Sequence, residues 1–286
     1  MGPFRTAGAV TLTLGSRRYD LRTRALVMGV LNRTADSFYP PAATLVLDDL
    51  LARADALVRE GADLLDIGGV KAGPGPEVTT AEELERVVPV VEELHRRFDV
   101  PLSVDTWRGE VAAACFAAGA VLGNDISGFA DPDYLPAAAR AGASVVATHI
   151  RLRPRVADPT PTYDDVTSTV RDFLDERWRR ARAAGVGPDQ VVVDAGLDLG
   201  KTTAHSLTLL RDSAVLASLG PPLLLSASNK GFLGELFDLP VTERRVPSLA
   251  AVAVGITGGC RVLRVHDVRG TVRVRDALAR VLEEAA

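Results

Sequence analysis

The sequence predicts an α/β fold in which eight parallel strands close into a (β/α)₈ TIM barrel, with an N-terminal β-hairpin covering the bottom of the barrel. Eight short runs rich in Val, Leu and Ile are bounded by Gly, Pro, Asn or Asp, as buried parallel strands are. Segments with apolar residues at helical spacing alternate with these runs. The chain has 286 residues, a length at which such a barrel forms one domain, so we expect a single domain of residues 1–286.

The expected elements follow one another along the whole chain. Residues 1–24 contain the hairpin, whose arms Ala9–Leu14 and Tyr19–Arg22 flank Gly15-Ser16. The eight strands are expected at Ala25–Leu31, Asp63–Ile67, Pro101–Val104, Ala120–Asp125, Ser144–His149, Gln190–Asp194, Pro221–Ser226 and Arg261–His266. The even alternation favours a closed barrel, and a doubly wound open sheet is the alternative.

Helices are expected between the strands. In the second, a stripe from Leu84 to Phe98 is apolar, and Thr80 with Glu83 forms a capping box. The fifth begins after Asp165 and ends at Gly185. The others are placed near residues 45–61, 109–119, 134–142, 203–219, 244–257 and 271–285.

Composition excludes several classes of function. The chain has 33 basic and 37 acidic residues, a formal charge of −4, so no overall basic field attracts nucleic acid or an anionic membrane. Its two cysteines, Cys115 and Cys260, lie far apart in apolar stretches, as buried thiols in a reducing compartment do. No apolar run reaches the length of a membrane span. We therefore expect a cytoplasmic protein that binds small molecules.

Polar side chains stand where the expected strands end. Barrel enzymes carry their chemistry on the C-terminal ends of the strands. Each of these residues alone could cap the next helix or a loop, and Asp105 and Asp125 are the clearest cases. Together they indicate a site at one mouth of the barrel. The residues are Asn32, Asp66, Asp105, Asn124, Asp125, Thr148, His149, Asp194, Ser226, Ser228, Lys230, Arg264 and His266.

These residues suggest two corners of different character. Arg264 and His266 share one face of a strand, and Lys230 arrives from the preceding loop, which suits a phosphate or diphosphate. An internal salt bridge of Arg264 with a neighbouring acid is the alternative.

The opposite corner, made of Asp105, Asn124 and Asp194, suits a flat heterocycle with several N–H groups and a carbonyl. A metal site is the alternative for these three residues.

Two loops near this mouth have the composition of lids, although either could be only a surface connection. One is Arg33–Thr44, and the other is Gly68–Thr80, whose glycines permit motion and contacts between backbone N–H groups and phosphate. A third loop, Arg151–Thr162, carries Arg151, Arg153 and Arg155 and is expected to be solvated, and the alternative is that its arginines steer an anion towards the mouth.

The strand-end motifs resemble those of the dihydropteroate synthase family. The resemblance extends from Met28 to Val268, in the order of the family. It rests on Met28-Gly-Val-Leu-Asn-Arg-Thr-Ala-Asp-Ser-Phe38, Asp66-Ile-Gly-Gly69, Ser103-Val-Asp-Thr106, Asn124-Asp-Ile126, Asp194-Ala-Gly196 with Gly200-Lys201, Ser228-Asn-Lys230 and Arg264-Val-His-Asp-Val268.

The resemblance implies a homodimeric transferase of folate biosynthesis that joins 6-hydroxymethyl-7,8-dihydropterin diphosphate to p-aminobenzoate and releases diphosphate. It assigns pterin binding to Asp105, Asn124, Asp194 and Lys230, with Asp194 and Lys230 as the catalytic residues. It assigns diphosphate binding to Asn32, Arg264 and His266, and places a Mg²⁺ ion at Asn32.

The departures from the family concentrate on the arylamine side. Where the family's second loop carries Ser-Thr-Arg-Pro, this chain has Val70-Lys71-Ala72-Gly73-Pro74, and Asn229 stands where the family has Arg. Lys71, Ser228 and Asn229 are therefore the candidates for the lid and the arylamine. An inactive paralogue that keeps pterin diphosphate binding is the alternative function. A pterin-dependent methyltransferase is a third, opposed by Arg264 and His266 because its ligand lacks a diphosphate.

Overall fold

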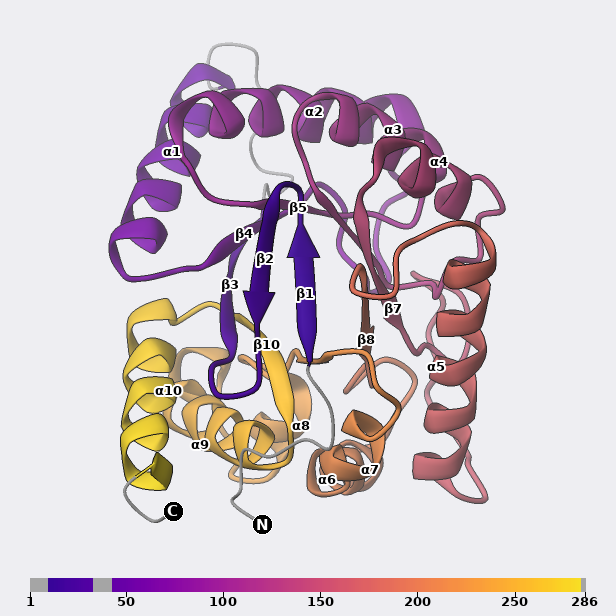
Figure 1. Ribbon diagram of the computed structural model, residues 1–286. Coiled ribbons are helices and arrows are strands. Elements are labelled where there is room, and N and C mark those ends of the chain that lie inside the picture. The colour runs from indigo at the N-terminus through magenta and orange to yellow at the C-terminus, as the bar shows by residue number, and fades with distance from the viewer. Residues whose placement is uncertain (1–9, 33–42, 284–286) are drawn as a thin grey trace.

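The computed structural model describes residues 10–32 and 43–283, and its strands form the expected closed barrel. Eight parallel strands pair in the order β10-β3-β4-β5-β6-β7-β8-β9, so that the last strand of the chain closes onto the first strand of the barrel (Figure 1). The prediction of a (β/α)₈ barrel is confirmed, and the open sheet is excluded. The strands are β3 (Leu26–Asn32), β4 (Leu64–Gly68), β5 (Leu102–Asp105), β6 (Leu122–Asp125), β7 (Ser144–Thr148), β8 (Val191–Asp194), β9 (Leu223–Leu225) and β10 (Cys260–Val265).

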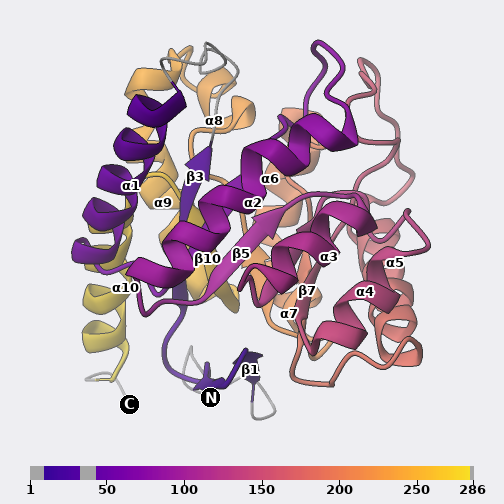
Figure 2. The same ribbon diagram turned by 90° about the horizontal axis from the view of Figure 1, so that it is seen from above.

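Helices surround the barrel and connect its strands (Figures 1 and 2). They are α1 (Ala43–Arg59), α2 (Thr80–Arg97), α3 (Gly109–Ala117), α4 (Tyr134–Ala141), α5 (Val166–Ala183), α6 (Thr203–Arg211), α7 (Ser213–Ala217), α8 (Gly231–Glu235), α9 (Arg245–Thr257) and α10 (Val268–Glu283), with a 3₁₀ turn at Val241–Glu243. Of the helices in the described ranges, none is long and apolar enough to cross a membrane.

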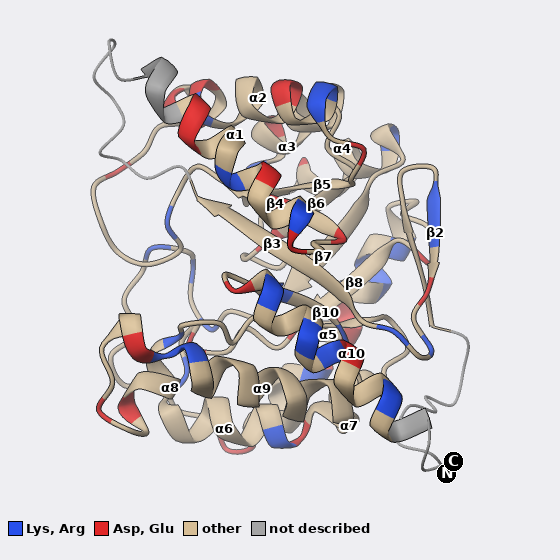
Figure 3. Ribbon diagram, turned by 90° about the vertical axis from the view of Figure 1, so that its left-hand side faces the viewer, with Lys and Arg blue, Asp and Glu red and all other residues tan. Residues whose placement is uncertain are grey.

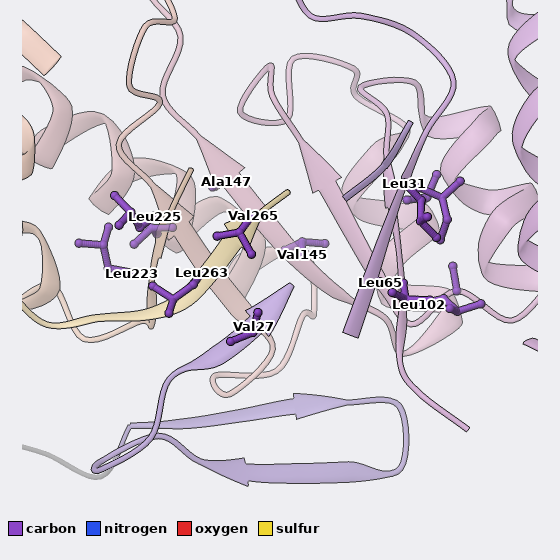
Figure 4. Close-up of a cluster of buried hydrophobic side chains, with 14 of the residues drawn as sticks. Val27, Leu31, Leu65, Leu102, Val145, Ala147, Leu223, Leu225, Leu263 and Val265 are labelled. Atoms are coloured by element: carbon purple, nitrogen blue, oxygen red, sulfur yellow. The ribbon is translucent and has the colours of Figure 1, made fainter. Parts of the chain in front are cut away.

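Alternation along the strands divides the core into two layers. On β7, Val145 and Ala147 face outward and pack with the helices, while Val146 faces inward. Figure 4 shows outward-facing side chains of this kind on several strands. Most inward-facing side chains of the lower barrel are apolar: Leu26, Met28, Leu64, Leu122, Val146, Val192, Leu224 and Val262.

The N-terminal hairpin closes the bottom of the barrel, as predicted. Strands β1 (Thr11–Leu14) and β2 (Arg17–Asp20) pair antiparallel around Gly15, whose φ of 60° suits glycine. Leu12, Leu14 and Leu21 are buried against the inward-facing apolar layer. Figure 2 shows the hairpin at one end of the barrel, with the loops after β4 and β7 projecting at the other.

Two details of the helices differ from the sequence predictions. The capping box of α2 is formed by Thr79 and Glu82, one residue earlier than expected, because Glu83 is fully buried and paired with Arg108. The expected helix over 203–219 is broken at Asp212 into α6 and α7.

Charges are mixed over the surface. On the side of the molecule shown in Figure 3, acidic and basic residues are interspersed over the helices. Cys115 and Cys260 are free and buried, which agrees with their expected packing role.

Candidate functional site

The upper interior of the barrel is polar, directly above the apolar layer. Because side chains alternate along a strand, the inward-facing positions two residues beyond the apolar layer lie at the mouth. The sequence places polar residues at most of these positions, which brings together side chains from β4 to β10. They are Asp66, Asp105, Asn124, Thr148, Asp194, Ser226 and Arg264. We call this set the floor of the site.

Arg264 holds two carboxylates of the floor. Its Nε donates to Asp66 Oδ2 at 2.6 Å and its Nη2 donates to Asp105 Oδ2 at 2.7 Å. Asp66 also accepts from Ser103 Oγ at 2.6 Å and from Asn124 Nδ2 at 3.2 Å. This network fixes the side chains from four strands against one another.

Arg264 and Asp105 were expected at opposite corners, and this expectation was wrong. Inward-facing residues of β4, β5 and β10 converge on the barrel axis, so the cation and the acids meet there. The alternative of an internal salt bridge is the one that the structure shows. The bonds to Asp66 and Asp105 use two of the five guanidinium N–H groups.

Burial and charge shift the ionisation of this cluster. Burial raises the pKa of Asp105 to about 7; Arg264 opposes this rise and the nearby Asp66 adds to it. Burial lowers the pKa of Arg264, but the negative charges of Asp66 and Asp105 raise it by more. The pKa of Arg264 therefore lies above its usual value. The floor therefore contains a permanent cation next to a carboxyl that titrates near neutral pH.

Lys230, from the loop after β9, lies close enough to Asp194 of the floor for each to affect the ionisation of the other. Burial raises the pKa of Asp194, and the neighbouring Lys230 opposes that rise. Burial lowers the pKa of Lys230, and Asp194 opposes that fall. Asp194 Oδ1 accepts from Gly196 N at 2.8 Å, and Lys230 Nζ donates to the carbonyl of Leu197. The loop after β8 thus binds both groups, the carboxyl through Gly196 N and the amine through the carbonyl of Leu197.

His266 and Ser228 meet at the mouth, but Asn229 has a backbone role. Ser228 Oγ lies 3.0 Å from His266 Nδ1 and accepts from His266 N at 3.1 Å. Burial and the charge of Arg264 lower the pKa of His266, so its ring is neutral near pH 7. Asn229 has a φ of 59°, donates through its N–H to Ser248 Oγ, and accepts at its carbonyl from Arg244.

A cavity of about 570 Å³ lies between the floor and the loop that follows β4. Asn32, Asp105 and Arg264 line it from the barrel, and Lys71 lines it from the loop. Asn32 Oδ1 lies over Gly68, where a Cβ would be 3.3 Å from that oxygen. Two of the three residues assigned to diphosphate, Asn32 and Arg264, thus share one cavity with the lid candidate Lys71, and His266 is not part of its lining.

Arg155 is a residue of this site that the sequence analysis missed. Its N–H donates to the carbonyl of Ala72 at 2.9 Å, and its guanidinium donates to the carbonyls of Lys71 and Pro76. Figure 2 shows the two loops side by side. We call residues 69–79 and 151–158 together the rim. The arginine loop is largely exposed, as expected, but its contact with the loop after β4 joins distant segments and was not predicted.

Lys201 and His149 form a further buried pair behind the floor. Lys201 Nζ lies 2.9 Å from His149 Nδ1 and donates to the carbonyl of Leu199 at 3.1 Å. Burial lowers the pKa of Lys201 to about 7, and burial with the adjacent lysine lowers that of His149 to about 3. The sequence shows Lys201 as one of three lysines in an arginine-rich chain, but gives no sign of its partner.

Other strand-end residues have structural roles. Asp125 accepts from Ser127 N at 2.6 Å and from Phe129 N at 2.9 Å, so its interpretation as a structural cap is confirmed. Asp105 does not cap α3, whose N-cap position is Arg108. Across residues 10–32 and 43–283, no three His, Cys, Asp or Glu side chains are grouped to hold a metal ion. Most of the first lid loop, residues 33–42, lies outside the described residues.

Comparison with known proteins agrees with this geometry. The sequence profile of the family described as "Pterin binding enzyme" matches residues 28–266. "Inactive dihydropteroate synthase 2" of Mycobacterium leprae is 44% identical, over 90% of this chain and 91% of the relative. "Dihydropteroate synthase" of Synechocystis is 38% identical, over 94% of this chain and 95% of the relative.

Solved structures show the same similarity. The dihydropteroate synthase of Yersinia pestis in complex with a sulfonamide drug superposes with a TM-score of 0.89 at 38% identity, covering 96% of this chain and 100% of that one. The dihydropteroate synthase of Xanthomonas albilineans with 4-aminobenzoic acid has a TM-score of 0.88 at 37% identity, covering 96% and 98%. Both cover nearly the whole barrel.

Proposed function

Since this chain belongs to the family of pterin-binding enzymes that includes the dihydropteroate synthases, we propose that it is a dihydropteroate synthase-type transferase. The donor substrate is 6-hydroxymethyl-7,8-dihydropterin diphosphate, the acceptor is p-aminobenzoate, and the products are dihydropteroate and diphosphate. The observation that carries this proposal is the floor, where Arg264 bonds to Asp66 and Asp105, and Asn124 bonds to Asp66, at the barrel mouth.

The floor offers the groups that a pterin ring requires. The Asp194 carboxylate accepts from ring N–H groups, and the Lys230 ammonium donates to a carbonyl or ring nitrogen. Asn124, whose Nδ2 is committed to Asp66, keeps its side-chain oxygen as an acceptor. Asp105 lies at the junction of floor and cavity, where it lines the space beside Arg264. These four residues hold the ring with its hydroxymethyl substituent directed to the cavity.

In the reaction, one C–O bond breaks and one C–N bond forms at the same methylene carbon. The C–O bond between the methylene and the diphosphate breaks, and diphosphate leaves with the electron pair. The amine nitrogen of the acceptor bonds to the methylene carbon and loses a proton. Arg264 offers its remaining N–H groups to the leaving group, and neutral His266 offers a hydrogen bond.

The residues at the cavity fit a Mg²⁺ ion bound together with the substrate. Mg²⁺ is commonly held by one or two protein oxygens, several waters and substrate phosphates. Asn32 Oδ1, which lines the cavity with Arg264, supplies such an oxygen. When bound there, the ion would neutralise charge on the leaving diphosphate.

A second candidate is a pterin diphosphate binder that does not transfer the arylamine. The rim favours it, because Val70, Lys71 and Ala72 replace the hydroxyls and guanidinium of the family loop. Lys71 is exposed, and a lysine is a point donor without the two-pronged geometry of arginine. The relative that is 44% identical is itself named inactive.

One experiment separates the two candidates. Purified protein is titrated with the dihydropterin diphosphate and Mg²⁺ in a calorimeter, p-aminobenzoate is added, and released diphosphate is assayed. Binding followed by amine-dependent release supports the synthase. Binding without release supports the second candidate, and no binding refutes both.

We also propose the setting in which the protein works. Residues 1–286 act as one domain in the cytoplasm, which the free thiols Cys115 and Cys260 support. Two copies pair through α8, α9 and the turn between them, where large apolar side chains are exposed: Leu236, Phe237, Val241, Val246 and Val254. Sedimentation of the parent protein tests the dimer, which a monomer at micromolar concentration would contradict.

A further inference from the structure

Thr148 is a floor residue whose hydroxyl group has no role in the proposed reaction as described above. Its side chain is 1% exposed, and among the described residues its Oγ1 has no hydrogen-bond partner. A buried hydroxyl without a partner is costly, and native proteins rarely keep one without a reason. The unpaired atom therefore indicates a group that another molecule completes.

The barrel geometry directs this side chain to the interior of the barrel, on the same face as Asp194. Thr148 shares the inward face of β7 with Val146, which belongs to the apolar layer below. In the parallel ladder, Thr148 is the register partner of Asp194 on β8. Register partners of neighbouring strands lie about 4.8 Å apart and face the same side of the sheet. A ring held by Asp194 is thus within hydrogen-bonding reach of the threonine.

The surroundings leave few other partners for the hydroxyl. The methyl group of Thr148 is directed toward Gly196, where a Cβ would lie 3.2 Å from it. The nearby carboxylate of Asp194 is engaged through Oδ1 with Gly196 N. His149, the next residue, faces away from the floor and pairs with Lys201.

We propose that Thr148 Oγ1 hydrogen-bonds the heterocycle and is a specificity-determining residue of the floor. The inference rests on the proposed pterin site and adds a demand on the ligand: the ring must carry a second polar atom beside the one that Asp194 binds. A ring edge with an N–H next to an amine, as in a 2-amino-4-oxo heterocycle, meets this demand. A ring with a C–H at that position leaves the hydroxyl unpaired and is rejected.

The test uses two substitutions of Thr148 and a matched control on the same strand. Thr148→Val keeps the shape and removes the hydroxyl, and Thr148→Ser keeps the hydroxyl. The control is Ser144→Ala, because Ser144 faces inward on β7 but its hydroxyl is partnered by the carbonyl of Thr13. Affinity for dihydropterin diphosphate with Mg²⁺ is measured by calorimetry, and thermal unfolding is measured without ligand.

The expected pattern separates a ligand contact from a structural role. Thr148→Val weakens binding about tenfold while its Tm stays level or rises, because an unsatisfied group has been removed. Thr148→Ser binds like the parent. Ser144→Ala binds like the parent and its Tm falls.

Unchanged affinity in Thr148→Val, with the parent binding normally, overturns this inference alone and leaves the pterin site intact. A fall in Tm with no loss of affinity also overturns it. If the parent itself does not bind the pterin diphosphate, the proposed function fails and this inference fails with it.

Discussion

The floor and the rim of the barrel mouth are built in opposite ways. In the floor, the residues that would touch a ligand are fixed by one another: Asp66 is buried, and the partly buried Asp105 and Arg264 bond to each other. In the rim, an arginine from one loop holds the backbone carbonyls of another, and the side chains facing the cavity are largely exposed. Sequence changes in the rim therefore cost little stability, whereas the floor tolerates few.

This difference explains how recognition of one substrate can persist while transfer to the other is altered. The floor belongs to the strands, so its geometry follows from the register of the barrel. The rim depends on loop residues, and its arginine at position 155 adopts a φ of 67°, a conformation unusual for a residue with a side chain. Under the proposed function, the pterin depends on the floor and the arylamine on the rim, which are separable parts of the molecule.

The largest effect is expected from breaking the floor. Arg264→Met removes the cation that pairs with Asp66 and Asp105 and leaves one buried and one partly buried carboxylate without compensation. The free energy of unfolding should fall by about 3–5 kcal/mol, measured by urea denaturation. Arg155→Met is the matched rim variant, expected to cost about 0.5 kcal/mol. Equal losses in the two variants would remove the distinction between floor and rim.

Much of this floor could be predicted from the sequence. Strand ends rich in Asp, Asn and Arg are visible as local patterns, and the closed barrel places them at one mouth. The pairing of Arg264 with Asp105 was not predictable in this way. It joins positions 159 residues apart, and it depends on how far the two side chains reach across the barrel axis.

The contacts of the rim and the short helix α8 could not be predicted from local sequence patterns either, because they also depend on residues distant in the sequence. Arg155 contacts a loop more than 75 residues earlier in the chain. The N–H groups that open α8 donate to Asp198, which lies in the loop after β8. Periodicity identifies elements, but contacts between loops are determined by tertiary packing.

A smaller effect should appear in the rim itself. Arg155→Gln removes the guanidinium bonds to Lys71 and Pro76, so the 69–79 loop should become about tenfold more sensitive to limited proteolysis. Mass spectrometry of the first cleavage products locates the cut. Arg153→Gln is the control, because Arg153 is an exposed residue of the same loop. Identical cleavage rates in all three proteins would show that Arg155 does not hold the rim.

The smallest expected effect is a pH dependence within the floor. The pKa of Asp105 is raised to about 7, so this carboxyl loses its proton as the pH rises through neutrality. The added negative charge beside Arg264 repels an anion, and the affinity for inorganic diphosphate should fall about threefold between about pH 6 and pH 8 relative to Asp105→Asn. Diphosphate itself also changes protonation over this pH range, and the comparison with Asp105→Asn removes that contribution because it is the same for both proteins. The same pH profile in both proteins would contradict the assignment to Asp105.

The separation of floor and rim is tested most directly by pterin affinity. Calorimetry with dihydropterin diphosphate and Mg²⁺ compares the parent, Asp194→Asn and Arg155→Gln. Asparagine keeps the acceptor for Gly196 N but loses the negative charge. We predict that Asp194→Asn binds at least about 100-fold more weakly, while Arg155→Gln stays within about threefold of the parent. Full affinity in Asp194→Asn together with lost affinity in Arg155→Gln would contradict the account, because pterin would then be bound by the rim.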